Sequence, residues 1–464
     1  MNPSLPKPIQ PVYPDLAVND PIELYEGELE VRYNGTEVRG PGWLRVDFLP
    51  SPNTRFELQS PKGASEAITQ PSNFLNAAKL CVPTYDRELD CLVTHFTPDW
   101  NVSESSPERL SIAGLLSGSA ATSDASTISE LHLPVVNLGP YRGTWVGTTK
   151  EENENQQVHG WAGRLVLEAD CWRITLDSAE DCEEIIKTLR NTGGFGITHN
   201  GMIEQEGREP FGAKDADEIL SALNYFLSFW RGQWCGAVAP IGYDANGQEV
   251  WRQLHVARLS QWSRETRSWS SDHVLANEQG QAFAGFWKLW QDQEWSDTLK
   301  VAIHWYIESN RRSGGMEGAL LLAHTALEML AWALCVAKRR VVRHKKFERL
   351  SSADRIRVLL KDVGVPLELE PAYEQLQKAS KELNWSDGPD AVVKLRNLIV
   401  HRAGKNLEEL NRVSNRARLE AWQLALEYLA LVLLKQCGYN GRYLPRMAKG
   451  WAGAVERLVP WAEG

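Results

Sequence analysis

The sequence predicts an α+β protein in which a β-rich region is followed by an all-α helical bundle. Short runs that alternate apolar and polar residues occur in the first half, whereas apolar residues recur at helical spacing from about residue 285. Because alternation indicates strands and a period of about 3.6 residues indicates helices, this change marks a change of architecture. We expect a Pro-rich, extended or disordered tail over 1–15, a β-rich region over 16–275 forming one unit or two subdomains, and a helical domain over 285–464.

Alternation and turn residues together predict the strands of the first half. Residues 29–33 alternate and precede Asn34-Gly35, a pair that tight hairpin turns prefer, and GYDANGQEVW at 242–251 has a similar hairpin character. Further strands are expected at 43–48, 165–167 and 172–177, loops at 102–130 and 151–157, and one helix at 214–231.

Helical periodicity predicts a bundle in the second half. The expected helices lie at about 295–312, 316–340, 351–362, 371–383, 388–403 and 411–437. Residues 316–340 are apolar nearly all round, which is typical of a central bundle helix. Ser351 or Ser352 is expected to cap the third helix, since a hydroxyl can accept from a free N–H of the first turn.

Composition excludes several classes of protein. The 464 residues are too many for one hydrophobic core. The chain has no run of about 18 apolar residues, so no membrane span is expected, and its Pro-rich start lacks the apolar stretch of a signal peptide. The seven cysteines are scattered and form no CxxC pair. We therefore expect no disulfide framework, no metal site, no cofactor, and a reducing, cytoplasmic location.

Charge is divided unequally between the two halves. Residues 285–464 hold 28 Lys and Arg against 21 Asp and Glu, whereas residues 1–284 hold 22 against 39. A basic half attracts polyanions, so any RNA partner is expected to bind the helical domain. Basic helical domains are also common without such a partner. The clearest basic run contains Lys338, Arg339, Arg340, Arg343, Lys345 and Lys346.

One segment of the helical half carries a pattern associated with chemistry. Arg396-Asn397 is followed after three residues by His401-Arg402, late in a predicted helix. This resembles the R-x4–6-H motif of the HEPN superfamily of ribonuclease domains, and 304–332 resembles the first two helices of the ApeA-like HEPN group of phage-defence proteins. The resemblance covers about 285–440 and implies a metal-independent endoribonuclease that acts as a homodimer. Arg339 and His344 have the same bare spacing, and we expect a solvated basic face there.

Residue chemistry indicates what each group of the motif does. Histidine titrates near neutral pH, so His401 is expected to handle the proton of the attacking 2′-OH. Arginine stays charged and binds phosphate bidentately, so Arg396 is expected to hold the developing phosphate charge. Five helical steps separate the two, so Arg396 must reach round or the site must be shared with a second helix. Asn397 is expected to orient His401 or the phosphate.

Four further residues are candidates for support. Asp390 is expected either to orient Arg396 or His401 or to cap the helix, a role for which Asp387 competes. Arg402 adds a second cation beside His401. Glu328 lies on an apolar helix and needs a partner, either a structural Arg or Lys or the site itself.

Three functions compete on the sequence alone. The first is an endoribonuclease of the antiphage-defence or toxin type, whose N-terminal region senses a trigger or restrains the nuclease. The second is a non-catalytic HEPN dimer that binds RNA or acts as a scaffold. The third, a Trp-rich carbohydrate binder or hydrolase, lacks a carboxylate pair that sequence can place at catalytic separation.

Overall fold

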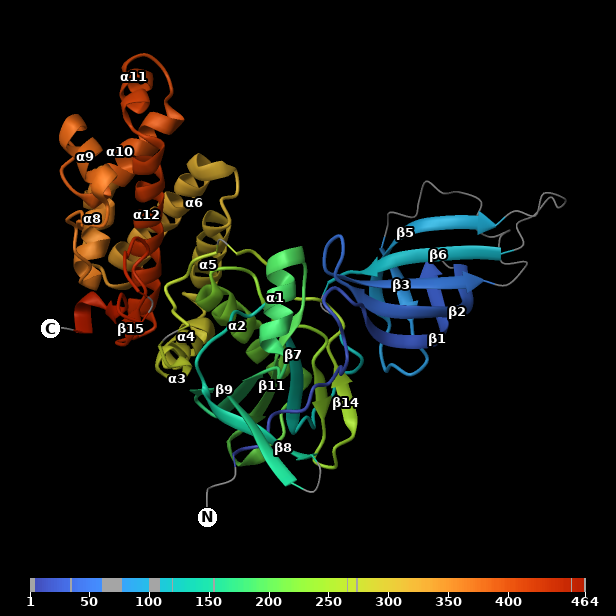
Figure 1. The fold of residues 1–464 in the computed structure, drawn as a ribbon. Coiled ribbons are helices and arrows are strands. Elements are labelled where there is room, and N and C mark those ends of the chain that lie inside the picture. The colour runs from blue at the N-terminus through green and yellow to red at the C-terminus, as the bar shows by residue number, and fades with distance from the viewer. Residues whose placement is uncertain are drawn as a thin grey trace.

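The computed structural model of the chain describes residues 5–33, 36–60, 77–99, 109–118, 120–152, 155–264, 266–272, 274–451 and 453–462. These residues form a β-barrel, a central domain built on a second sheet, and a helical bundle. The barrel and the bundle lie on opposite sides of the central domain (Figure 1). The predicted α+β class is confirmed, with strands leading and helices following.

The barrel is closed, and its strands are neighbours in the order β1-β2-β3-β6-β5-β4, with β4 pairing back to β1. Its strands are β1 (Ile22–Tyr33), β2 (Thr36–Asp47), β3 (Asn53–Ser60), β4 (Ala77–Cys81), β5 (Leu89–Asp99) and β6 (Arg109–Leu116). Alternate side chains of β3, including Phe56 and Leu58, are buried because successive side chains point to opposite faces. The barrel core continues into the central domain, where Phe195 stacks on Phe48.

The predicted hairpin at the start of the barrel agrees with the strand pairing. Residues 29–33 lie in β1, and Tyr33 pairs with Thr36 of β2. The turn residues Asn34-Gly35 lie outside the described residues.

The predicted loop over 102–130 is wrong in part. Strand β6 lies inside it, and Leu110 and Ile112 of that strand are buried in the barrel core. The Ser- and Ala-rich composition concealed a strand whose small residues suit a crowded barrel: a Cβ at Gly114 would meet the ring of Phe56. Residues 102–108 lie outside the described residues.

The central sheet has eight strands, ordered β14-β13-β7-β11-β10-β9-β8 with β12 beside β7. Its strands are β7 (Glu130–Val136), β8 (Thr144–Glu152), β9 (Asn155–Ala169), β10 (Trp172–Ser178), β11 (Ile197–Gln205), β12 (Gly236–Ala237), β13 (Ile241–Tyr243) and β14 (Glu249–Arg252). The strands predicted at 165–167 and 172–177 lie in β9 and β10.

Turn chemistry explains the predicted hairpin over 242–251. Strands β13 and β14 pair antiparallel, and the Asp244 carboxylate between them accepts from the backbone N–H groups of Asn246 and Gln248. The loop expected at 151–157 is wrong in part, because β8 extends to Glu152 and β9 begins at Asn155, so most of that stretch belongs to the strands of a hairpin. Residues 153–154 lie outside the described residues.

The Pro-rich tail is held against the central sheet from residue 5 onward. Ile9 N–H donates to Asp177 Oδ2 over 2.8 Å, and Gly147 N–H donates to Pro6 O over 3.0 Å. Arg164 donates to Lys7 O and also forms a paired contact with Asp177. An extended tail is therefore correct for these residues, and it is hydrogen-bonded rather than loose.

Helices α1 (Cys182–Thr192) and α2 (Ala213–Arg231) pack on the central sheet. The apolar stripe of α2 is buried, including Leu223, Phe226 and Leu227. Phe226 also touches α4 (Ala282–Gln291), with its ring centroid 5.1 Å from that of Phe283 and 5.4 Å from that of Phe286. One hydrophobic core therefore runs from the central sheet into the bundle.

The bundle begins earlier than residue 285. Its helices are α3 (Ala276–Gly280), α4 (Ala282–Gln291), α5 (Ser296–Asn310), α6 (Gly315–Trp332), α7 (His344–Glu348), α8 (Ser352–Val363), α9 (Glu374–Leu383), α10 (Gly388–Val400), α11 (Lys405–Arg412) and α12 (Asn415–Gln436). The short strands β15 (Arg442–Tyr443) and β16 (Arg457–Leu458) pair after α12. Ser351 is the cap predicted for α8, and its hydroxyl accepts from Asp354 N–H.

The last predicted helix is divided in two. Residues 411–437 were expected to be continuous, but the chain breaks after Arg412 and Ser414 caps α12 by accepting from Ala417 N–H. Helix α11 was not predicted, because its apolar content is low. Gly404 is the N-cap of α11, with a φ of +52°.

Helix α6 and the π-helical segment after it (Ala333–Lys338) form one apolar stretch. Residues 315–338 are long and apolar enough to cross a membrane. An 18-residue stretch within them has a mean hydropathy of 1.8, and 56% of that stretch is buried in the structure. Helices α5, α8, α10 and α12 pack against α6. A central position in the bundle accounts for its composition, as predicted from sequence.

Candidate functional site

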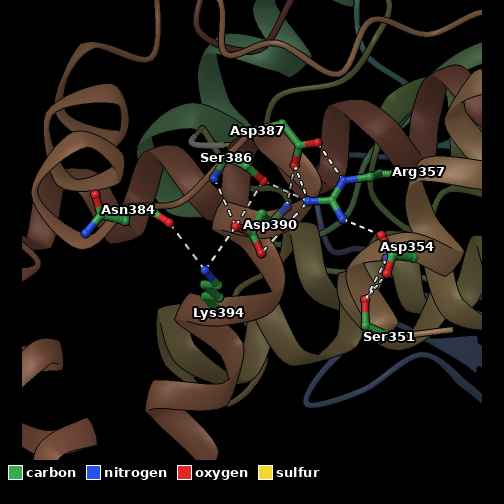
Figure 2. A network of polar contacts seen from close by, with 8 residues as sticks. All are labelled: Ser351, Asp354, Arg357, Asn384, Ser386, Asp387, Asp390 and Lys394. Carbon is green, nitrogen blue, oxygen red and sulfur yellow. Dashed lines mark hydrogen bonds and ion pairs between the residues drawn. The ribbon is translucent and has the colours of Figure 1, made fainter.

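The N-terminal end of α10 is fixed by an extensive polar network (Figure 2). Asp387 is the N-cap, and its Oδ1 accepts from Asp390 N–H over 2.9 Å. Arg357 of α8 donates to both carboxylate oxygens of Asp387, at 2.6 Å and 3.0 Å, and to Asp354. These bonds raise the pKa of Arg357, and they tie α8 to the start of α10.

Asp390 belongs to this network and not to the motif. It accepts from Ser386 N–H at 2.9 Å and lies 3.1 Å from Lys394 Nζ and 3.9 Å from Arg357. Burial raises the pKa of Asp390, but the bonds from Ser386 and Lys394 outweigh it, so the pKa lies below the ordinary value. The expected contact of Asp390 with Arg396 or His401 is not formed, because Asp390 faces α8.

Arg396 and Asn397 interact with each other on the last turns of α10. Arg396 Nη1 donates to Asn397 Oδ1 over 3.0 Å, and both residues are half-buried. Arg396 Nε is buried and has no hydrogen-bond partner among the described residues. Asn397 therefore positions the guanidinium, whereas the sequence predicted that it would orient His401 or the phosphate.

A second polar group from α6 lies next to Arg396. His324 is buried, with Nε2 2.8 Å from Ser352 Oγ and Nδ1 3.8 Å from Glu328 Oε2. Burial lowers the pKa of His324, Glu328 raises it and the positive charge of Arg396 lowers it, with a net shift downward. His324 is therefore neutral at pH 7, as expected of a core histidine.

Glu328 has the basic partner that its apolar helix required. Its Oε1 lies 3.7 Å from Arg355 Nη1 of α8, and its side chain is 29% exposed. The structural pairing expected from sequence is present.

His401 lies at the other side of the helix end, in solvent. It is the C-cap residue of α10, its backbone N–H donates to Asn397 O over 2.9 Å, and its side chain is exposed. Arg402 beside it is exposed too. Within the described residues, neither imidazole nor guanidinium has a side-chain partner, and no contact joins His401 to Arg396.

The basic run over 338–346 is partly used by the fold itself. Lys338 pairs with Asp292 at 3.0 Å, and Arg339 donates to Asp362 over 2.6 Å and to Gln436 over 3.2 Å. His344 lies 3.4 Å from Glu348 and not with Arg339, so their shared spacing makes no site. The exposed cations left without an ion pair are Arg340, Arg343, Lys345 and Lys346, among the residues described.

This arrangement separates two chemical tasks within one chain. Arg396, oriented by Asn397, can bind an anionic oxygen, while His401 can exchange protons with a molecule in solvent. No group of three or more His, Cys, Asp or Glu suited to a metal ion occurs in the described part of the chain. Sequence reasoning missed Arg355 and Ser352; the only signal was that Glu328 and His324 needed partners.

Comparison with known proteins divides the chain where the structure does. Residues 123–265 match the family described as the YopA central domain, and residues 292–457 match the YopA C-terminal domain. The chain resembles YopA throughout. It is 24% identical over 462 residues, covering 96% of each chain, to "SPbeta prophage-derived uncharacterized protein YopA" of Bacillus subtilis (strain 168). No solved structure matches the chain.

The YopA match bears on architecture more than on chemistry. The first matched segment spans the central sheet with α1 and α2, and the second spans α5 to β16. Neither description refers to a HEPN fold or to RNA, so the resemblance of Arg396 and His401 to the HEPN motif stays a prediction.

Proposed function

We propose that the helical domain is a metal-independent endoribonuclease. The 2′-oxygen of a ribose attacks the adjacent phosphorus, its bond to the 5′-oxygen breaks, and a 2′,3′-cyclic phosphate and a 5′-hydroxyl result. His401 moves the proton between these oxygens, and Arg396 stabilises the charge on the phosphate. Asn397 holds Arg396 in place.

One observation carries the proposal: a half-buried arginine oriented by its neighbour lies five residues before an exposed histidine whose imidazole has no side-chain partner among the described residues. A structural Arg or His normally has partners within its own fold. Because Arg396 and His401 do not meet within one chain, the proposed site combines groups from two copies related by twofold symmetry. The exposed Arg340, Arg343, Lys345 and Lys346 supply a path for the RNA backbone.

The decisive experiment measures cleavage of labelled RNA by the full chain in EDTA. Wild type is expected to cut and to leave cyclic phosphate ends, whereas His401→Ala and Arg396→Ala are expected to be inactive. His344→Ala is the matched control, since His344 has the same spacing from an arginine but pairs with Glu348. Equal cleavage by wild type and His401→Ala identifies a contaminant and refutes the proposal.

A second function is favoured by the separation of Arg396 and His401. A non-catalytic dimer that binds RNA or acts as a scaffold needs no meeting of the two side chains. It predicts RNA binding or dimerisation that survives both alanine substitutions, with no cleavage by any variant. Sedimentation of the full chain with and without RNA separates this outcome from the first.

The setting we propose is a cytoplasmic, phage-related role in antiviral defence or toxicity. The phage-related role is supported by the word 'prophage-derived' in the name of the Bacillus relative. The cytoplasmic location is supported by the burial of the apolar helix α6 inside the bundle. The barrel and central domain would then sense a trigger or restrain the nuclease. Cell viability on expression of wild type against His401→Ala tests toxicity directly.

A further inference from the structure

A cavity of about 360 Å³ lies where the central domain meets the C-terminal part of the chain. Three segments line it: the end of α2 with 138–141, the connecting segment 266–272, and residues 444–456 after α12. This volume is in the range of small-molecule sites, which are commonly found between domains. The cavity is remote in sequence from Arg396 and His401 and plays no part in the proposed cleavage.

The cavity wall contains a cation without a counter-charge bonded to it. Arg231, the last residue of α2, has its guanidinium 4.6 Å from the ring of Trp262, and its Nε is buried with no hydrogen-bond partner in the described part of the chain. Burial lowers the pKa of Arg231, although Asp272 nearby acts in the other direction. Arg231 is half-buried, and Nε is its buried unpaired group. A buried N–H without an acceptor is costly, and an anion in the cavity beside Asp272 would satisfy it.

Arg446 also belongs to the wall, but its guanidinium is bonded to residues of the bundle interior. It is 2% exposed and donates to Asn310 Oδ1 and Tyr306 OH, each at 2.7 Å, and to Gln423 Oε1 at 3.4 Å. Its Nε is likewise buried without a partner, and no carboxylate pairs with its guanidinium among the described residues. Arg267 adds a third cation to the wall and donates to Arg446 O.

The same wall offers one unused acceptor. Glu456 is 7% exposed, its Oε1 accepts from Ser271 and from Gly453 N–H, and its Oε2 is buried without a donor. Tyr141 and Trp230 supply aromatic surface. A ligand that satisfies these groups carries an anion, at least one hydrogen-bond donor and a flat apolar part. Arginine matches the geometry of both phosphate and carboxylate bidentately, and phosphate carries the greater negative charge.

We propose that this cavity binds a nucleoside phosphate, with its phosphate at Arg231 and Arg267 and a sugar hydroxyl or base amino group donating to Glu456. The site joins the two segments that match the YopA domains, so an occupant would fix one against the other. The absence of a side chain at Gly139 leaves room for Arg231, because a Cβ there would lie 3.1 Å from Arg231 Cδ and would crowd the guanidinium.

Calorimetry on the full chain tests the proposal with ADP, GDP, CDP and UDP, and with adenosine and pyrophosphate as partial probes. At least one nucleoside diphosphate is expected to bind, at least about tenfold more tightly than adenosine. Arg231→Met is expected to weaken that binding at least about tenfold, which is about 1.4 kcal/mol. Arg39→Met is the matched control, because Arg39 lies on the barrel and its side chain is 65% exposed.

Thermal unfolding separates a ligand site from a structural role for Arg231. Without ligand, Arg231→Met is expected to melt at the same temperature as wild type or higher, because a buried N–H without an acceptor is removed. A variant that melts lower and binds nucleotides like wild type overturns the proposal, as does failure of all four diphosphates to bind. Arg267→Met at the same wall provides a second variant if Arg231→Met does not fold. Unchanged affinity in that variant then overturns the proposal.

Discussion

The two ends of α10 are opposites in how their side chains are used. At the N-terminal end Asp387, Asp390 and Arg357 satisfy one another in a dense network. At the C-terminal end the side chains of His401 and Arg402 are exposed, and neither has a side-chain partner within the described residues. Substitutions at the two ends of α10 should therefore affect different measurements. Those at the bonded N-terminal end should change stability, and those at the exposed C-terminal end should change activity.

The largest expected effect is on activity and comes from the exposed C-terminal end. His401→Ala is expected to reduce RNA cleavage by at least about 100-fold, the lower range for loss of a general acid or base. Its unfolding free energy should change by less than about 0.5 kcal/mol, because the side chain is exposed. Cleavage rates and denaturant unfolding of the same preparation check both halves of the prediction. A large loss of stability would place His401 among the structural residues instead.

The next effect is on stability and comes from the bonded N-terminal end. Arg357→Ala is expected to cost about 2–3 kcal/mol, because it leaves Asp387 partly buried without its cation. The side chains of Arg357 and Asp387 are 22% and 17% exposed, so solvent screens the pair only in part. Urea unfolding measures the change. Arg402→Ala, at the other end of the helix, is the control and should leave the midpoint unchanged.

A smaller effect depends on pH. The folded-state pKa of Asp390 lies below the ordinary value of 3.8, so its charged form stabilises the fold at neutral pH. Asp390→Asn is therefore expected to cost about 1 kcal/mol at pH 7, and the difference from wild type should fade as the pH falls below the ordinary value and wild-type Asp390 becomes protonated. Unfolding curves at pH 7 and pH 3 test this. A difference that grows on acidification would contradict the direction of the shift.

The smallest effect concerns RNA affinity. Arg402→Ala is expected to reduce the slope of log affinity against log salt by about 1, as for loss of one phosphate contact. Arg339→Ala should change that slope less, since Arg339 is held by Asp362. Titrations of RNA at several salt concentrations provide the comparison. Identical slopes for all three proteins would show that RNA does not approach this end of α10.

Local patterns predicted the longer bundle helices and some strands, but not strands β3, β4, β5, β7, β8 and β11, and not the contacts between elements. Helix α2, the hairpin over 242–251 and a serine cap on α8, for which Ser351 and Ser352 were both candidates, depend on residues close in sequence and were predicted correctly. Strand β6 and helix α11 were missed because their residues are small or polar and only the surrounding fold stabilises them.

The candidate site shows the same limit. Sequence spacing identified Arg396, Asn397 and His401, yet it could not show that Asn397 binds Arg396 or that Asp390 faces Arg357. Those choices depend on which helices flank α10. The partners of Glu328 and His324 come from α8, some 25 or more residues further along the chain, and no local rule connects them.

The aromatic packing of Phe226 against Phe283 and Phe286 has a consequence for how the chain can be divided. Separating the central sheet from the bundle would expose a hydrophobic surface on both fragments. The aromatic rings of α2 would be exposed on one fragment and those of α4 on the other. During synthesis the central domain cannot complete its core until α4 has been made, and an isolated bundle is expected to aggregate. Any activity of the helical bundle is therefore expected only in a protein that also contains the central domain.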